Sequence, residues 1–318
     1  MSPSRSHDTV AALAAVLAAA ALLVLSAPRI ARAEEPLFAS SATMDPRALA
    51  LAGALRATPC STSGLYLNPA TLTMAPIYHL NLMYQYAREQ DANLHMAGAA
   101  IADSITSSVI GAGLSLNYLR ANERRTDFES WDARLALSGN IKDIFFIGVT
   151  GRYLRVEDDL ESGDRGPNGR PALPSSGSQQ MDGLTFDAGA ALRLGHVVSL
   201  GVTGYNLSKT DSAYAPLGLG TGVGVSLFEM LLIEADAAFD FTSHDKTAAK
   251  IDTGLELLLG NRVPIRVGYG YDVYYNINTI AAGVGYVDPS FAIDLGFQKD
   301  VVDGGRLVFA LGLRIFIG

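Results

Sequence analysis

The feature that most constrains the fold of this chain is an alternating pattern in residues 306–317, directly before Gly318. Successive side chains of a β-strand point to opposite faces, so every second residue shares a face. One face of this segment is entirely apolar: Leu307, Phe309, Leu311, Leu313, Ile315 and Ile317. The other face carries smaller or charged residues: Arg306, Val308, Ala310, Gly312 and Arg314. The pattern predicts a strand with one side in an apolar environment and the other facing a polar interior.

Residues 1–33 have the organisation of an export signal. Arg5 supplies a positive start, residues 10–25 contain only Ala, Leu and Val, and Ala31-Arg-Ala33 fits a cleavage site before Glu34. The apolar run is shorter than the roughly 20 residues of a membrane-spanning helix, which favours a cleaved signal peptide over an uncleaved anchor. We therefore expect an exported protein.

The composition after this signal favours a membrane β-barrel. The chain is 49% hydrophobic and 18% charged, with 32 glycines and 13 tyrosines, yet no later stretch has the length of an apolar transmembrane helix. A barrel accommodates these values because its apolar residues occupy every second position. Cys60 is the only cysteine, so an internal disulfide is excluded, and the net charge of −8 argues against a nucleic-acid partner. No metal-ligand spacing, phosphate-binding loop or redox cysteine pair occurs, so no cofactor is expected.

Alternating segments bounded by turn residues predict about fourteen antiparallel strands in residues 77–318. The predicted spans are 77–88, 93–104, 107–120, 127–139, 144–157, 182–195, 197–208, 217–228, 230–242, 246–259, 263–273, 276–287, 290–300 and 305–317. Connections after even-numbered strands are tight, whereas most of those after odd-numbered strands are longer or more charged; the connections near His244 and Tyr275 are the weaker cases. This sorting is typical of outer-membrane barrels, and it places the longest loop, 158–181, outside the cell.

Residues 34–76 differ from the strands and are expected to form an N-terminal plug. Asp45-Pro46 is a helix-start signal, and residues 48–57 are predicted to form the body of a short helix. A motif follows shortly before the first strand, made by Tyr66, Asn68, Pro69, Ala70 and Leu72. Proline restricts the preceding Asn to extended geometry, so Asn-Pro-Ala predicts a rigid corner; shaping this turn is favoured over direct ligand contact.

This motif, with Gly53 in the small-residue stretch before it, resembles that of the FadL/PorV-like outer-membrane family. The resemblance implies a fourteen-stranded barrel with an N-terminal plug in the outer membrane of a Gram-negative bacterium. One branch of that family passes long-chain fatty acids or other hydrophobic compounds. The alternative is a PorV-like barrel that docks secreted or surface proteins. The single extended loop and the charged interior of this chain depart from a greasy tunnel and keep that alternative open.

The final strand adds a second resemblance. Gly312, Ile315 and Ile317 have the spacing of the C-terminal signal of bacterial outer-membrane barrels, although Phe316 has the opposite parity to the usual terminal aromatic residue. The resemblance implies the barrel-assembly machinery as a partner, and the apolar faces imply contact with outer-membrane lipid.

Parity along the strands separates an outward face from an inward face. The outward positions are apolar and include Trp131, Leu135, Leu184, Phe186, Ile265, Val267, Ile293 and Leu295. The inward positions carry polar candidates: Arg134, Arg152, Glu234, Asp236, Asp252, Glu256 and Arg266. A Lys or Arg facing hydrocarbon at the midplane would cost roughly 2–4 kcal/mol, so these charges must point inward.

The mixed charges favour a hydrogen-bonded network packed against the plug. The alternative is cation or solute contact at the carboxylate stripe of Glu234, Asp236, Asp252 and Glu256. The inward glycines leave space for either the plug or a ligand: Gly111, Gly113, Gly220, Gly222, Gly224, Gly268, Gly270, Gly283 and Gly285.

Two other functional classes are disfavoured. His79 and His95 lie on adjacent predicted strands with predicted inward parity, but no nucleophile motif accompanies them, so we do not expect an enzyme. A non-selective porin usually has more strands, and the segment before the first strand argues against an open channel.

Overall fold

The computed structural model describes residues 44–58, 61–89, 92–122, 127–158, 181–208, 212, 214–243, 246–302 and 305–317. The chain divides into two units, residues 1–32 and 33–318, and every described residue belongs to the second. The predicted signal peptide, Cys60, His244 and most of loop 158–181 lie outside the described residues.

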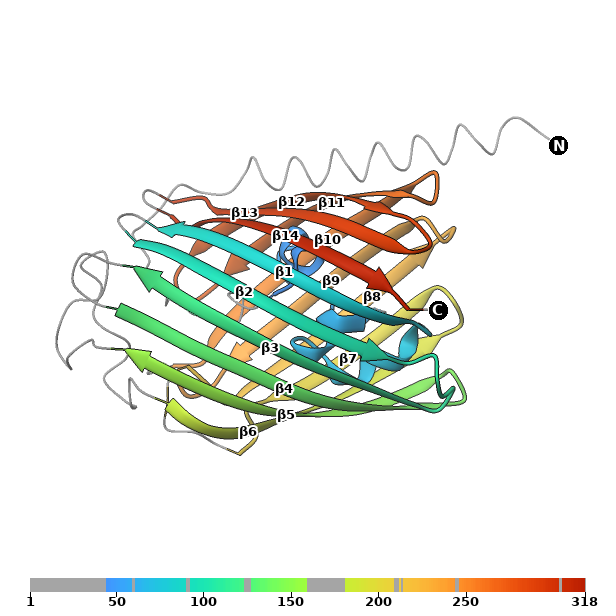
Figure 1. Ribbon diagram of the computed structural model, residues 1–318, viewed down its shortest axis with the longest axis horizontal. Helices are drawn as coiled ribbons and strands as arrows, with labels where there is room; N and C mark the ends of the chain where they lie inside the picture. Colours follow the sequence, from blue (N-terminus) through green and yellow to red (C-terminus); the bar gives the residue numbers. More distant parts are fainter. Residues whose placement is uncertain are drawn as a thin grey trace. The chain divides into compact units, whose positions relative to one another are not determined.

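Fourteen antiparallel strands form a closed barrel, in which each strand pairs with its neighbours in sequence and β14 pairs with β1 (Figure 1). The strands are β1 (Tyr78–Glu89), β2 (Ala92–Asp103), β3 (Ile110–Asn122), β4 (Asp127–Ile141), β5 (Phe145–Asp158), β6 (Met181–Leu194), β7 (Val198–Tyr205), β8 (Gly218–Leu227), β9 (Leu231–Asp240), β10 (Ala248–Leu259), β11 (Val263–Asp272), β12 (Ile277–Val287), β13 (Phe291–Asp300) and β14 (Leu307–Phe316). Closure gives every strand a hydrogen-bonded partner at both edges, which is what a sheet in lipid requires. The predicted all-β antiparallel barrel, its strand number and the approximate strand spans are confirmed.

The side chains of the wall alternate between an apolar exterior and a buried interior. On β6, Leu184 and Phe186 are 63% and 54% exposed, whereas Thr185 and Asp187 are buried. On β14, Phe309 and Leu311 are exposed while Val308 and Ala310 are buried, as the final-strand pattern predicted. An apolar outer face around a closed barrel is the arrangement that spans a bilayer.

Among the described residues, no helix is long and apolar enough to cross a membrane.

The predicted inward parity of His95 is wrong. The β1–β2 register pairs Tyr86 with His95, and the neighbours Leu94 and Met96 are buried, so His95 lies on the exposed outer face. Because a strand has a period of two, the register of the hairpin alone decides which face a residue takes. His79 points inward and is fully buried, so the two histidines lie on opposite sides of the wall.

Residues 44–58 and 61–76 lie inside the barrel (Figure 1, blue segments) and are almost entirely buried. They contain α2 (Pro46–Ala50) and two 3-10 helices, η2 (Ser61–Leu65) and η3 (Pro69–Met74). Helix α2 packs against β11 to β14, and η3 packs against β3 to β6. The segment therefore contacts the inner face of the wall on two separate groups of strands, β11 to β14 and β3 to β6.

Helix α2 begins where the sequence predicts but ends much earlier. The Asp45 side chain accepts a hydrogen bond from the Ala48 N–H at 2.8 Å and caps the first turn. The helix then stops at Ala50 instead of residue 57, because Ala52 and Gly53 have φ values of 57° and 98°. The Gly53 N–H bonds to the Ala48 carbonyl and the Ala52 N–H to the Leu49 carbonyl, which is a Schellman ending.

Candidate functional site

The interior site begins at the Asn-Pro-Ala corner. Asn68 is fully buried, and its Oδ1 accepts a hydrogen bond from the Ala70 N–H at 3.1 Å, which caps η3. Its Nδ2 donates to the Arg56 carbonyl at 2.8 Å and to the Ala190 carbonyl of β6 at 3.3 Å. Pro69 is the first residue of η3 and needs no hydrogen-bond partner for its nitrogen. Asn68 thus stabilises the turn and connects η3 both to Arg56 of the same segment and to β6 of the wall.

Glycines in the strands allow the backbone of the N-terminal segment to lie close to the backbone of the barrel wall. A Cβ atom at Gly148 would lie 2.4 Å from the Pro69 carbonyl carbon, and one at Gly201 would lie 2.1 Å from the Arg56 carbonyl oxygen. At Gly268, a Cβ would lie 2.5 Å from the Leu51 carbonyl carbon. The sequence left open whether inward glycines make room for a plug or a ligand. At Gly268, which is one of those predicted glycines, and at Gly148 and Gly201, which are not, the space holds backbone of the described N-terminal segment.

The carboxylate stripe on β9 and β10 binds this segment. Asp236 Oδ2 accepts hydrogen bonds from the Leu55 and Arg56 N–H groups, each at 3.0 Å. Glu234 accepts from the Ala57 N–H at 2.6 Å and from the Thr58 hydroxyl. The backbone of residues 55–57 uses its N–H groups for these contacts, which explains why it does not continue the helix. Glu234 and Asp236 are both buried; both oxygens of Glu234 and Oδ2 of Asp236 accept hydrogen bonds from the segment, whereas Oδ1 of Asp236 has no hydrogen-bond partner among the described residues.

Arg56 adds ion pairs to the hydrogen bonds between this segment and the carboxylate stripe. Its Nη1 lies 3.0 Å from Asp236 Oδ2 and 4.0 Å from Asp252 Oδ2, and its Nε donates to the Tyr205 hydroxyl at 2.9 Å. Lys250 lies 3.2 Å from Asp252 on the same strand. Burial lowers the pKa of Arg56, but Tyr205 and the two aspartates outweigh it and hold this pKa above its ordinary value.

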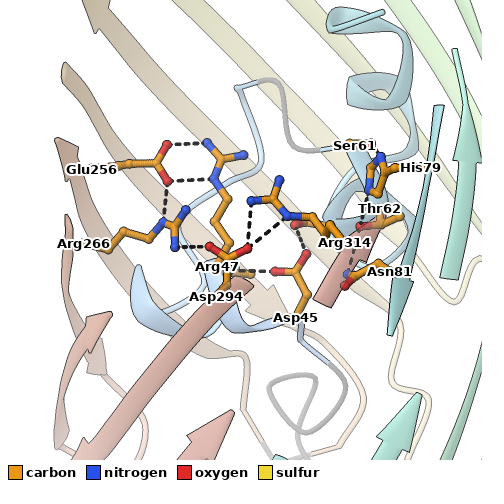
Figure 2. A network of polar contacts seen from close by, with 12 residues as sticks. Asp45, Arg47, Ser61, Thr62, His79, Asn81, Glu256, Arg266, Asp294 and Arg314 are labelled. Carbon is orange, nitrogen blue, oxygen red and sulfur yellow. Dashed lines mark hydrogen bonds and ion pairs between the residues drawn. The ribbon is translucent and has the colours of Figure 1, made fainter. Parts of the chain in front are cut away.

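A second polar network joins α2 to the neighbouring part of the wall, from β10 to β14 (Figure 2). Arg47 Nη2 lies 2.8 Å from Glu256 Oε1, and Arg266, which also contacts Glu256, lies 2.6 Å from Asp294 Oδ1. Arg314 on β14 lies 2.8 Å from the other oxygen of Asp294. The network therefore alternates positive and negative groups across β10, β11, β13 and β14.

A third network surrounds the aromatic residue of the motif. Arg134 and Arg152 each lie 2.8 Å from Asp132, and Arg134 Nη1 donates to the Leu65 carbonyl at 3.2 Å. The Arg134 guanidinium lies 4.9 Å from the centre of the Tyr66 ring, within the range of a cation–π contact. Burial raises the pKa of the Tyr66 hydroxyl to about 12.

A small polar cavity lies beside the second network (Figure 2). It has a volume of about 130 Å³, and its lining includes Asp45, Ser61, His79, Asn81 and Arg314. The Asn81 Oδ1 is buried without a hydrogen-bond partner. Ligand pockets usually measure roughly 300–1,000 Å³, so this cavity suits water or a very small polar molecule. Within the described ranges, no group of three or more His, Cys, Asp or Glu is arranged to hold a metal ion.

The interior becomes apolar toward the barrel end that carries the longest connection, the one between β5 and β6. Here an apolar lining is formed by inward side chains of β1 to β6 and β14: Ala87, Leu94, Met96, Leu119, Phe128, Leu154, Val156, Met181 and Val308. The register places Met96 beside Leu119, and Val156 beside Met181. All of these residues belong to one buried cluster that also contains Leu65 and Leu67 of the N-terminal segment.

This lining is not among the features predicted from the sequence. Its signal is present in the sequence: Leu94, Met96, Leu119, Leu154 and Val156 occupy inward positions where most other strands carry polar residues or glycine. The predicted polar candidates instead fall into three networks. In the first network, Asp236 and Asp252 contact Arg56, and Glu234 contacts the neighbouring Ala57. In the second, Glu256 and Arg266 form an ion pair beside α2. In the third, Arg134 and Arg152 both contact Asp132.

Comparison with protein families finds no matching family model, and no curated protein sequence matches. Solved structures do match. The CymD monoaromatic hydrocarbon channel has a TM-score of 0.68 at 11% identity, covering 86% of this chain and 97% of CymD. The Ralstonia pickettii toluene transporter TbuX has a TM-score of 0.64 at 10% identity, covering 86% of this chain and 98% of TbuX. A Pseudomonas aeruginosa FadL homologue has a TM-score of 0.63 at 15% identity, covering 90% and 99%. The chain therefore has the barrel fold of FadL-type outer-membrane transporters.

Proposed function

We propose that this chain is an outer-membrane barrel of a Gram-negative bacterium that passes small hydrophobic compounds, with residues 44–76 acting as its plug. The observation that carries the proposal is the apolar lining at the long-loop end of the interior. Apolar side chains on the inward face of a membrane barrel have no role in contacting lipid, so they suit an apolar ligand or plug surface. The toluene transporter and the monoaromatic hydrocarbon channel among the structural neighbours support the same class of compound.

Uncharged hydrocarbons fit this interior better than fatty carboxylates. A fatty acid bound inside the barrel needs a cation for its headgroup, because burial of an unpaired carboxylate is costly. Arg47, Arg56, Arg134, Arg266 and Arg314 are each already paired with a carboxylate. We therefore propose aromatic or aliphatic hydrocarbons as the first ligand class to test and long-chain fatty acids as the second.

Passage requires the plug to move. Residues 44–58 and 61–76 fill the space beside the wall glycines, and the described strands pair continuously around the barrel. A ligand that reaches the apolar lining therefore meets Leu65 and Leu67 before it can proceed. The polar networks around Arg47 and Arg56 are the contacts that oppose displacement of the plug. The PorV-like docking role gains no support from the three neighbours described above, and we do not propose it.

The test is uptake of radiolabelled toluene and oleate by cells that lack their own hydrophobic-compound channels and express this chain. Leu119→Asn places an amide in the apolar lining, and Leu119→Met is the matched apolar control. We expect toluene uptake above the empty-vector level, a several-fold loss in Leu119→Asn and retention in Leu119→Met. Toluene uptake equal to the empty vector, with the folded barrel present in the outer membrane, would refute the proposal.

A further inference from the structure

The outer face of the barrel has a hollow across β14, β1, β2, β3 and β4. Its volume is about 450 Å³, and apolar and aromatic side chains form most of its lining: Leu82, Tyr84, Leu116, Tyr118, Trp131, Leu311 and Leu313. The register explains the hollow. Ala97 lies between Tyr84 and Tyr118, and Ala99 lies between Leu82 and Leu116, so two small residues form a trough between large neighbours.

The trough has a defined direction across the membrane. Its aromatic residues Tyr84 and Tyr118 lie toward the barrel end that carries the longest connection, between β5 and β6, because β1 and β3 run toward that end. Aromatic side chains of membrane barrels concentrate where hydrocarbon meets the headgroups. The aromatic end of the trough, nearest the β5–β6 connection, therefore lies at the headgroup layer of the outer leaflet.

Cationic side chains stand directly above the trough on the same outer face. Arg120 is paired in register with His95, one outward position beyond Tyr118, which is about 7 Å along the strand. Arg88 and Lys299 both pair with Leu307 and form the next row, and both side chains are exposed. Arg120 thus lies in the row directly beyond the trough, and Arg88 and Lys299 lie one row farther along the strands.

Two acidic groups lie near this rim: Glu129, and Glu157, which neighbours Glu129 in register and is paired with Arg155. Glu129 lies 3.7 Å from Arg120, and the two side chains are 39% and 49% exposed. An exposed ion pair at this distance contributes little to stability. A phosphate, which has several acceptor oxygens, therefore competes effectively with Glu129 for Arg120. The rim keeps a positive balance among these described outward groups, with Arg88 and Lys299 added to the Arg120–Glu129 pair.

We propose that this trough and its rim bind one molecule of the phosphorylated glycolipid of the outer leaflet. One acyl chain lies over Ala97 and Ala99, the sugar headgroup contacts the aromatic rim, and a phosphate contacts Arg120 and Arg88. The complementarity of an apolar trough with a cationic border identifies a lipid that has both an acyl chain and an anionic headgroup. The site rests on the outer-membrane location and not on the transport of hydrocarbons, so it can fail or succeed independently.

The test is native mass spectrometry of the full-length protein purified from outer membranes in mild detergent, with chemical analysis of the retained lipid. Ala97→Leu fills the trough, and the double variant Arg88→Gln/Arg120→Gln removes rim charge. The matched controls are Ala188→Leu on the outer face of β6 and Arg262→Gln in the turn between β10 and β11, at the other end of the barrel. Heat-modifiable migration on gels verifies that each variant is a folded barrel.

The proposal predicts one phosphorylated glycolipid per wild-type and control barrel, and at least a several-fold loss of that lipid in both the trough and rim variants. It is overturned by equal retention in all variants, by a wild-type barrel without retained glycolipid, or by retention of glycerophospholipid alone. A dimer of the chain that dissociates in Ala97→Leu would likewise overturn it, because the trough would then be covered by a second copy. Toluene uptake in the rim variant is expected at the wild-type level, which separates this site from the proposed transport path.

Discussion

The variant Arg56→Met tests directly what holds the N-terminal segment inside the barrel. It removes the guanidinium while keeping most of the side-chain length. Arg56 is 3% exposed, lies 3.0 Å from Asp236, and donates to the Tyr205 hydroxyl at 2.9 Å. The variant therefore leaves a buried carboxylate without its counter-ion, and it leaves Tyr205 without one partner.

The expected loss follows from the contacts that remain. Removing one partner of a buried ion pair costs about 3–5 kcal/mol. Asp236 still accepts from the Leu55 N–H and from the residue 56 N–H, so we expect the lower end, about 3 kcal/mol. This free energy corresponds to roughly a hundredfold increase in the open population of residues 54–58. The strands should be unaffected, because their hydrogen bonds lie between neighbouring strands.

Amide hydrogen exchange of the purified barrel, followed by mass spectrometry, measures this opening. Exchange at residues 54–58 should accelerate roughly a hundredfold, whereas exchange in the strands should not change. Arg262→Met, at an exposed arginine in a turn, is the control for loss of an arginine. Wild-type exchange at residues 54–58 in Arg56→Met would refute the argument that this ion pair retains the segment.

Three further predictions concern the same segment. Asn68→Ala removes a cap and leaves the Arg56 carbonyl without its amide donor; we expect a loss of about 1–3 kcal/mol, measured as faster proteolysis of the segment in a folded barrel. Gly148→Val places a side chain against the backbone of η3, so ion conductance in planar bilayers should rise, whereas Gly183→Val, where an added Cβ meets nothing within 4 Å, should leave it unchanged. Tyr66 has a pKa of about 12, so its contribution to retention is complete below pH 10, the pKa of the exposed group, and is lost as the pH rises through about 12. Conductance should therefore rise across this alkaline range, and Tyr66→Phe should reduce that rise; an unchanged profile in Tyr66→Phe would contradict the assignment.

The barrel itself was predictable because its signal is local. A strand has a period of two, so a lipid-facing side chain at every second position marks strand, face and length at once. Residues 306–317 show this pattern, and β14 has the predicted faces. The helix start at Asp45-Pro46 was predictable for the same reason, since a cap involves only residues within one turn. The sequence alone therefore determined the closed antiparallel architecture and the beginning of α2.

The tertiary structure decided the features that depend on contacts between distant residues. Residues 51–57 have helical composition, but the Schellman ending and the carboxylates of β9 draw their N–H groups into other bonds. His95 lies on the outer face because the β1–β2 register places it there, and a one-residue difference reverses the face of every side chain. The carboxylate stripe binds the N-terminal segment, and the apolar lining gathers from seven strands, because barrel closure brings together positions that no local period connects.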